Sequence, residues 1–165
     1  LDSPFNDLID TALKIHELFN KTKIKSFIKT SGKKGLHIYV PLDGQYNYDV
    51  AREFCRIVAL YLANKNPNLI SIDRLPEKRT GKVYIDYLQN RLGQTTASIY
   101  SARPILHACV STPLEWTEVN TELKFTDFTI KSIPERLKVK GDLWKDISIT
   151  RNNLTESLSL LKELD

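Results

Sequence analysis

The sequence contains no methionine, only two cysteines and no long hydrophobic run. Cys55 and Cys109 lie in apolar surroundings and lack the spacing of a metal site or a disulfide framework, so we expect buried, reduced thiols in a cytosolic protein. Because no segment approaches the ~20 apolar residues of a membrane-spanning helix, we expect no membrane partner. The N-terminal residues show no basic segment followed by an apolar stretch, and therefore no visible export signal.

The size and charge of the chain are ordinary for a folded domain. At 165 residues it can bury a real core, and we expect a single domain over residues 1–165 with a terminal helix and tail over 147–165. The 24 lysines and arginines outnumber the 20 acids, and the formal charge of +4 favours a polyanionic partner only weakly. The chain starts at an expected helix N-terminus without an initiator methionine, which predicts a piece of a longer protein.

The hydrophobic pattern predicts an α+β fold. Helical periodicity in the apolar residues predicts three helices, over 4–20, 49–65 and 154–164. Runs rich in β-branched and aromatic residues predict four strands, over 24–30, 36–42, 82–86 and 105–111. A glycine turn joins the first two strands into a hairpin. This order of elements is typical of a mainly antiparallel sheet backed by helices on one face.

The turn of this hairpin has the composition of an anion site. Within seven residues, from Ser31 to His37, it holds a hydroxyl, two glycines, two lysines and an imidazole. Glycine amides and ammonium groups together can hold a phosphate, and His37 stands where the turn becomes strand. The imidazole could donate one hydrogen bond as a neutral ring or add charge as a cation. The alternative is an ordinary glycine hairpin with exposed lysines.

Acidic and basic side chains elsewhere could complete such a site. Asp86 ends the strand over 82–86, and Asp2 precedes the first helix. Paired carboxylates can hold the two divalent ions of phosphoryl or nucleotidyl transfer, and arginine suits a bidentate phosphate contact. Asp86 directly follows an apolar run, where an unpaired carboxylate is costly to bury, so we expect a metal or arginine partner. The plainer alternatives are a capping acid at Asp86 and a helix-dipole acid at Asp2.

Six segments resemble, in order, the motifs of one family. They are residues 29–42 (KTSGKKGLHIYVPL), 85–90 (IDYLQN), 100–103 (YSAR), 110–116 (VSTPLEW), 133–137 (IPERL) and 141–144 (GDLW). Together they resemble the polymerase domain of bacterial DNA ligase D, within the archaeo-eukaryotic primase superfamily. The resemblance runs from residue 1 to about 146 and implies that superfamily's catalytic core, which resembles an RNA-recognition fold.

The resemblance also implies an activity and the residues that perform it. The activity is template-directed, two-metal addition of nucleotides, with ribonucleotides preferred, to a DNA primer by an ATP-dependent DNA ligase of end-joining repair. The implied metal ligands are Asp2 and Asp86, for Mn²⁺ or Mg²⁺, and the implied catalytic residues are these two and His37. The implied contacts to the nucleoside triphosphate are Ser31, Gly32, Lys34, His37, Arg79, Gln89 and Arg103.

The same resemblance implies the molecular context. The partners would be DNA ends with a primer-template, a ligase module in the same polypeptide and a Ku-type end-binding protein, in the bacterial cytoplasm at the nucleoid. The family's first motif acid would lie immediately before Leu1, and its N-terminal half before that. We therefore expect this chain to keep the nucleotide half-site but to polymerise weakly or not at all by itself.

Two other functions are compatible with the residues. One is a non-catalytic sheet module that binds nucleic acid and resembles an RNA-recognition domain. The other is a different phosphate-handling enzyme, such as a nuclease or a primase without repair partners. The polymerase interpretation requires Asp86 to lie within metal-bridging reach of the glycine turn and His37.

Overall fold

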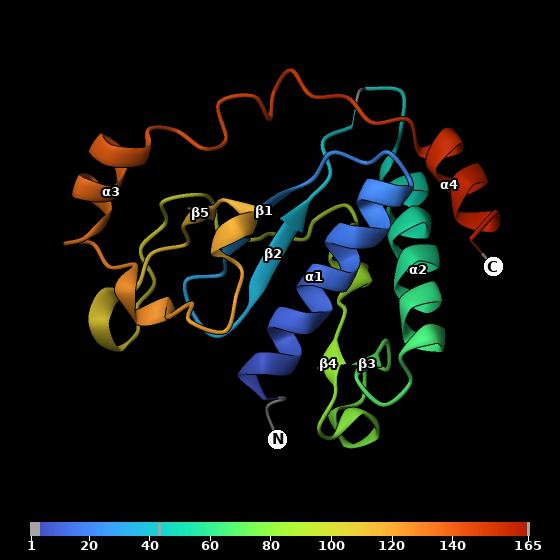
Figure 1. The fold of residues 1–165 in the computed structure, drawn as a ribbon, viewed down its shortest axis with the longest axis horizontal. Coiled ribbons are helices and arrows are strands. Elements are labelled where there is room, and N and C mark those ends of the chain that lie inside the picture. The colour runs from blue at the N-terminus through green and yellow to red at the C-terminus, as the bar shows by residue number, and fades with distance from the viewer. Residues whose placement is uncertain (1–3, 43, 165) are drawn as a thin grey trace. The chain divides into compact units, whose positions relative to one another are not determined.

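The computed structural model describes residues 4–42 and 44–164, and its fold is α+β, as the sequence predicts (Figure 1). The described residues divide into two compact units, each made of separate segments of the chain. The helical unit comprises residues 4–24, 42, 44–96 and 152–164, and the sheet unit comprises residues 25–41 and 97–151. That both units fold as one domain over residues 1–165 stays a prediction.

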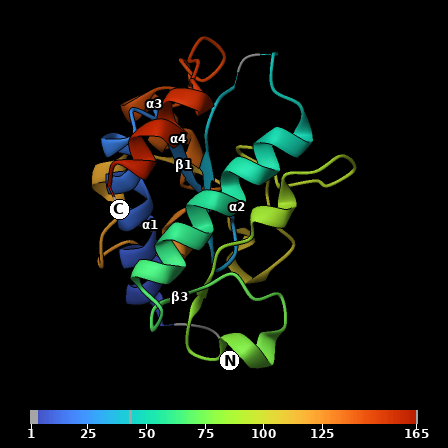
Figure 2. The same ribbon diagram turned by 90° about the vertical axis from the view of Figure 1, so that its right-hand side faces the viewer.

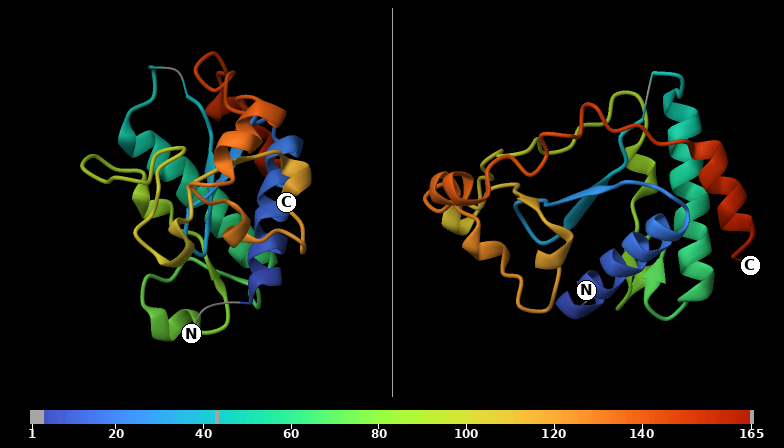
Figure 3. Two further views of the ribbon diagram at one scale, coloured as in Figure 1. Left: turned by 90° about the vertical axis from the view of Figure 1, so that its left-hand side faces the viewer. Right: turned by 45° about the horizontal axis from the view of Figure 1, so that its top comes forward.

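Three helices build the helical unit: α1 (Phe5–Lys21), α2 (Tyr48–Lys65) and α4 (Leu154–Lys162). They lie side by side in two views (Figures 1 and 3), and their bounds agree with the predicted ones to within two residues. Side-chain caps start two of them, since Asn47 Oδ1 accepts from Val50 N and Asn153 Oδ1 accepts from Thr155 N. None of the helices among the described residues is both long and apolar enough to cross a membrane.

A short parallel pair of strands completes the helical unit. Strand β3 (Ile70–Ser71) follows the C-terminal end of α2 (Figure 2) and pairs with β4 (Val83–Tyr84). The predicted strand over 82–86 is therefore too long, because the pairing covers only Val83 and Tyr84 and a 3₁₀ turn begins at Tyr87. Apolar side chains of α1, α2 and both strands form the core of this unit.

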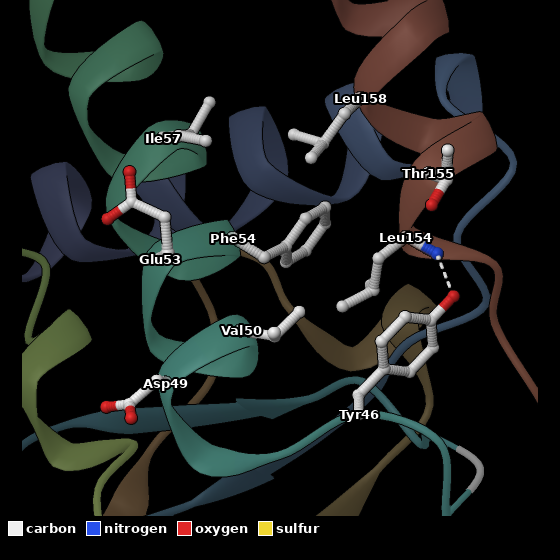
Figure 4. A pocket seen from close by; sticks show the side chains of 9 residues that line it. All are labelled: Tyr46, Asp49, Val50, Glu53, Phe54, Ile57, Leu154, Thr155 and Leu158. Atoms are coloured by element: carbon white, nitrogen blue, oxygen red, sulfur yellow. Dashed lines mark hydrogen bonds between the residues drawn. The ribbon is translucent and has the colours of Figure 1, made fainter.

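A groove between α2 and α4 is hollow and mainly apolar (Figure 4). The Tyr46 hydroxyl accepts a hydrogen bond from Leu154 N at one end of it, and Phe54, Leu154 and Leu158 point into it. Its charged lining consists of the acids Asp49 and Glu53. A groove with carboxylates and without a cation in its lining repels a phosphate, so it does not fit the predicted anion site.

An antiparallel sheet is the centre of the sheet unit. Its strand order is β2 (Leu36–Tyr39), β1 (Phe27–Thr30) and β5 (Pro113–Leu114). The predicted hairpin is confirmed, with shorter strands, and its register places Lys29 opposite His37. Trp144 packs edge-on against Phe27 and Tyr39 and donates to Ile28 O, which fixes the segment around Trp144 against the sheet.

The prediction of a strand over 105–111 is wrong. The segment holds a 3₁₀ turn, Leu106–Ala108, in which His107 and Ala108 have positive φ angles of 71° and 46°. A strand cannot pass through two left-handed residues, and within residues 105–111 only single bridges form, both after the turn, at Cys109 and Val110. His107 is an exposed residue of the turn.

The sequence pattern also missed helix α3 (Ile133–Lys140), whose first turn contains Pro134. The guanidinium of Arg136 holds this helix in place. It donates two hydrogen bonds of 2.7 Å to the Glu118 carboxylate and one to Pro113 O. The short helix is stabilised by these tertiary contacts more than by its own weakly amphipathic sequence.

Candidate functional site

The glycine turn between β1 and β2 is closed by Ser31. Its backbone N–H donates to Gly35 O, and its Oγ accepts from Lys33 N at 3.2 Å and Gly35 N at 3.0 Å. Two amides of the turn are thus occupied by the serine, and the expectation that the amides themselves cradle a phosphate is wrong for these two. The Ser31 hydroxyl proton is one side-chain donor that the turn can offer to an anion.

Gly32 brings this turn directly against Arg103. It has a φ of +72°, and a Cβ at this position would lie 2.5 Å from Arg103 Cγ and 2.9 Å from Ser111 N. Both the left-handed backbone and the missing side chain are therefore required here. Because Gly32 has no side chain, the turn can approach Arg103 closely, and the arginine lies next to the hairpin.

Lys29 is a buried lysine that faces the same region. Its side chain is 0% exposed, and its Nζ donates to Ser111 Oγ at 2.5 Å and contacts His37 Nδ1 at 3.1 Å. The pKa of Lys29 falls to about 8, because burial disfavours the ammonium and Arg103 repels it. Lys29 is therefore still largely protonated at neutral pH.

His37 is half-buried beside this ammonium. Its pKa is lowered to about 4, first by burial and then by the positive charges of Lys29 and Arg103. The ring is therefore neutral at pH 7. Of the two possibilities that the sequence leaves open, this environment selects the neutral hydrogen-bond donor.

Arg103 completes a cluster of positive charge without a compensating acid. The charged neighbours that shift the pKa values of Lys29 and His37 are, within the described chain, cations only. The Arg103 Nε is buried and has no acceptor among the described residues. Unpaired buried donors and like charges both cost free energy, and a bound anion would remove both costs. We call Lys29, His37 and Arg103 the cationic cluster.

The buried ammonium predicts a pH dependence of stability. The pKa of Lys29 is about 8 in the folded protein and near 10.5 in the unfolded chain. Between these values the unfolded chain binds more protons, so the free energy of unfolding contributed by Lys29 rises from pH 8 toward pH 10. Urea denaturation should show the wild type gaining stability relative to Lys29→Met over this range. The wild type should gain no stability relative to Lys33→Met over this range, because Lys33 is an exposed residue of the turn.

A constant difference in the free energy of unfolding between wild type and Lys29→Met from pH 7 to 10 would contradict this burial of the charge.

Lys34, the lysine predicted to contact a triphosphate, lies in the glycine turn and is exposed. Its ammonium can contact a ligand at the surface, but it adds little positive charge to the buried cluster. The sheet unit thus brings together Ser31, Gly32, His37 and Arg103, with Lys34 at the rim.

A second group of predicted site residues lies in the helical unit. The Arg79 guanidinium stacks on the Tyr84 ring at 4.0 Å, and the Tyr84 hydroxyl donates to Asp86 Oδ1 at 3.4 Å. The pKa of Tyr84 is raised, by burial first and then by the Asp86 charge. The Arg79 Nη1 is buried without an acceptor among the described residues, as is the Arg103 Nε. Tyr84 therefore contacts both Arg79, whose Nη1 is unsatisfied, and the carboxylate of Asp86.

The Asp86 carboxylate is exposed, so the expected cost of burying it does not arise. Among the described residues, its oxygens accept one hydrogen bond, the long one from Tyr84, and they suit a hard divalent cation. Gln89 is partly occupied, because its Nε2 donates to Thr95 O at 2.7 Å and holds the following loop.

Asp2 lies outside the described residues, and no group of three potential metal ligands occurs in the part of the chain that the structure describes. Asp86 and His37 belong to different units. That Asp86 and His37 share one pocket stays a prediction.

Lys29, Ser111 and Tyr84 were not assigned roles from the sequence. A signal for Lys29 was available, because a five-residue turn in the hairpin, residues 31–35, places it opposite His37. Ser111 could not be found this way, since it is 82 residues from Lys29 and its segment is not a regular strand.

A family model and sequence relatives match most of this chain. Residues 2–144 match the family described as LigD, primase-polymerase domain. The chain is 34% identical to the bifunctional non-homologous end joining protein LigD of Bacillus subtilis (strain 168), over 98% of this chain and 27% of that protein. It is 29% identical to the multifunctional LigD of Pseudomonas aeruginosa, over 94% of this chain and 19% of that protein.

A solved structure agrees with these matches. The polymerase domain of Mycobacterium tuberculosis ligase D, in complex with DNA, superposes with a TM-score of 0.83 at 28% identity, covering 91% of this chain and 52% of that one. The chain therefore belongs to the family of LigD primase-polymerase domains. It spans about a quarter of the B. subtilis relative's length.

Proposed function

We propose that this chain carries the nucleotide-binding part of a nucleotidyltransferase that adds ribonucleotides to DNA ends during end joining. Its membership of the LigD primase-polymerase family supports the reaction class. The observation that carries the proposal is the cationic cluster, in which a buried lysine and a buried arginine N–H lie beside an imidazole without a carboxylate. A polyphosphate is the ligand that such a cluster fits best.

In this proposal each residue has a chemical task. Arg103 and the neutral His37 donate hydrogen bonds to phosphate oxygens, and the Ser31 hydroxyl and the exposed Lys34 add donors at the rim. Arg79 offers its unpaired N–H, with its plane held by Tyr84. Fixed donors cost little reorganisation when the charge on the phosphates shifts during transfer.

The acids fit a divalent ion by their chemistry. Asp86 presents exposed carboxylate oxygens, and together with Asp2 it would hold Mn²⁺ or Mg²⁺. When bound, such an ion neutralises phosphate charge and lowers the pKa of a coordinated hydroxyl. Gln89 would contribute through its amide oxygen, since one of its N–H groups already holds the loop.

The proposed partners follow from the family. The M. tuberculosis domain was solved in complex with DNA, and we propose DNA ends with a primer-template as the second substrate here. The relatives are much longer than this chain, which agrees with a ligase module in the same polypeptide. We further propose a Ku-type end-binding partner and a place at the bacterial nucleoid in the cytoplasm.

Calorimetric titration of a ribonucleoside triphosphate, with and without Mn²⁺, tests this function. His37→Ala should weaken binding roughly tenfold, the effect of losing one hydrogen bond to a charged group. Asp86→Ala should abolish the gain in affinity that Mn²⁺ produces. Matched controls are His107→Ala and Asp127→Ala, which remove an exposed histidine and an exposed aspartate.

Wild-type affinity in both His37→Ala and Asp86→Ala would refute the site. Release of inorganic phosphate from the triphosphate would instead favour another phosphate-handling enzyme. Binding of RNA that survives Asp86→Ala, without binding of a triphosphate, would favour a nucleic-acid-binding module.

A further inference from the structure

The hydrogen bonds of Lys29 account for all three protons of its ammonium. Acceptors lie at 2.5 Å (Ser111 Oγ), 3.1 Å (His37 Nδ1) and 3.5 Å (Thr30 O) from Nζ. The Ser111 hydroxyl donates its own proton to Thr30 O at 2.8 Å. Toward Lys29, the Ser111 oxygen can therefore only accept a hydrogen bond. The ammonium is the donor in the Lys29–Ser111 bond.

The direction of the Lys29–His37 contact is fixed by the same reasoning. An ammonium has protons and no lone pair, so the imidazole Nδ1 must be the acceptor. A neutral imidazole carries one proton, which is then on Nε2. Lys29 keeps its charge up to about pH 8 and His37 stays neutral down to about pH 4, so this arrangement holds at neutral pH.

We propose that Lys29 is a positioning residue that locks His37 in the tautomer with its proton on Nε2, and that Ser111 holds Lys29 in place for this purpose. The ring then presents an N–H donor at the partly exposed edge of the hairpin. The identity of the ligand that receives this donor, a triphosphate oxygen, rests on the proposed function. The tautomer itself does not.

Burial makes a purely structural role for Lys29 a poor explanation. Full burial of a lysine ammonium costs free energy, and an apolar side chain of similar length would fill the same space in the strand without this cost. The ammonium also lies 5.8 Å from the centroid of the Tyr39 ring, whose face stabilises a cation from the side that offers no hydrogen bond. These contacts keep the charge in place beside the imidazole.

Long-range ¹H–¹⁵N correlation spectra of the histidine rings test the tautomer. The chain has three histidines, so the His37 signals can be assigned with a single His37→Gln variant. In the wild type at pH 7, we expect the pattern of a neutral ring protonated on Nε2. In Lys29→Met we expect a mixture of tautomers, and in Ser111→Ala a shift in the same direction. Lys33→Met should leave the wild-type pattern unchanged.

A wild-type ring that is protonated on Nδ1, or is an imidazolium at pH 7, would overturn the inference whether or not any variant folds. An unchanged Nε2–H pattern in folded Lys29→Met would also overturn it, because the ring would then need no lysine. Should Lys29→Met fail to fold, the wild-type pattern and Ser111→Ala decide.

Triphosphate binding separates this inference from the proposed function. If both hold, Lys29→Met weakens binding about tenfold in the wild-type background and much less when His37 is already alanine. If the spectra show the expected tautomers but neither variant changes triphosphate binding, the positioning role stands and the proposed function fails. If His37→Ala weakens binding while the tautomer is wrong, the proposed function stands and the positioning role fails.

Discussion

Replacing Arg103 with methionine is expected to weaken triphosphate binding about a hundredfold while the protein stays folded. Two charge-assisted hydrogen bonds to phosphate oxygens would be lost, and each is worth about 1.5–3 kcal/mol. The buried Nε has no acceptor among the described residues, so its removal breaks no recorded hydrogen bond. A methionine also keeps most of the packing of the aliphatic stem against Gly32.

The same substitution should raise the pKa of Lys29, because Arg103 is one of the two causes that lower it. The free energy of unfolding should therefore stay within about 1 kcal/mol of the wild-type value. Calorimetric titration gives the affinity and urea denaturation gives the stability. The control is Arg74→Met, at an exposed arginine of the helical unit. Wild-type affinity in Arg103→Met would remove the arginine from the site, and a large loss of stability would show a structural role instead.

The second large effect is expected from Gly32→Ala. The alanine would have to adopt a φ of +72°, which costs roughly 1–2 kcal/mol for a residue with a Cβ. Its Cβ would also lie 2.9 Å from the backbone nitrogen of Ser111, which cannot move as a flexible side chain can. The turn must then shift away from Arg103. We expect a loss of about 3 kcal/mol in the free energy of unfolding, together with loss of triphosphate binding.

Gly81→Ala is a matched control for this substitution. Gly81 has a nearly identical φ of +73°, and a Cβ there would meet nothing within 4 Å. The Gly81 variant thus measures the cost of the left-handed backbone alone, roughly 1–2 kcal/mol, and the excess in Gly32→Ala measures the close approach. Equal losses of stability in the two variants would show that the contact with Arg103 and Ser111 is unimportant.

Local signals in the sequence were sufficient for the helices and the hairpin. The apolar periodicity of α1 and α2 and the glycine turn after Thr30 act over a few residues, so their elements could be predicted without knowing the rest of the chain. The segment over 105–111 has the composition of a strand, but the left-handed residues His107 and Ala108 interrupt it. No local pattern predicts that alanine takes such a conformation.

The candidate site shows the same division between local and tertiary information. His37 and Gly32 follow from the composition of the turn, whereas the burial of Lys29 depends on Ser111, far away in the sequence. A lysine in a strand is usually exposed, and only the tertiary structure shows that this one is not. Likewise, a metal or arginine partner was expected for Asp86 because an unpaired carboxylate after an apolar run is costly to bury, but its strand ends at Tyr84 and the carboxylate is exposed.

The central claim, that the cationic cluster binds the triphosphate, is tested most directly by a crystal structure of the protein with a non-hydrolysable ribonucleoside triphosphate and Mg²⁺. The expected result is phosphate oxygens within hydrogen-bond distance of His37 Nε2 and the Arg103 guanidinium, with Lys29 still bonded to His37 Nδ1. A triphosphate seated on other cations, with His37 and Arg103 making no contact to it, would contradict the claim.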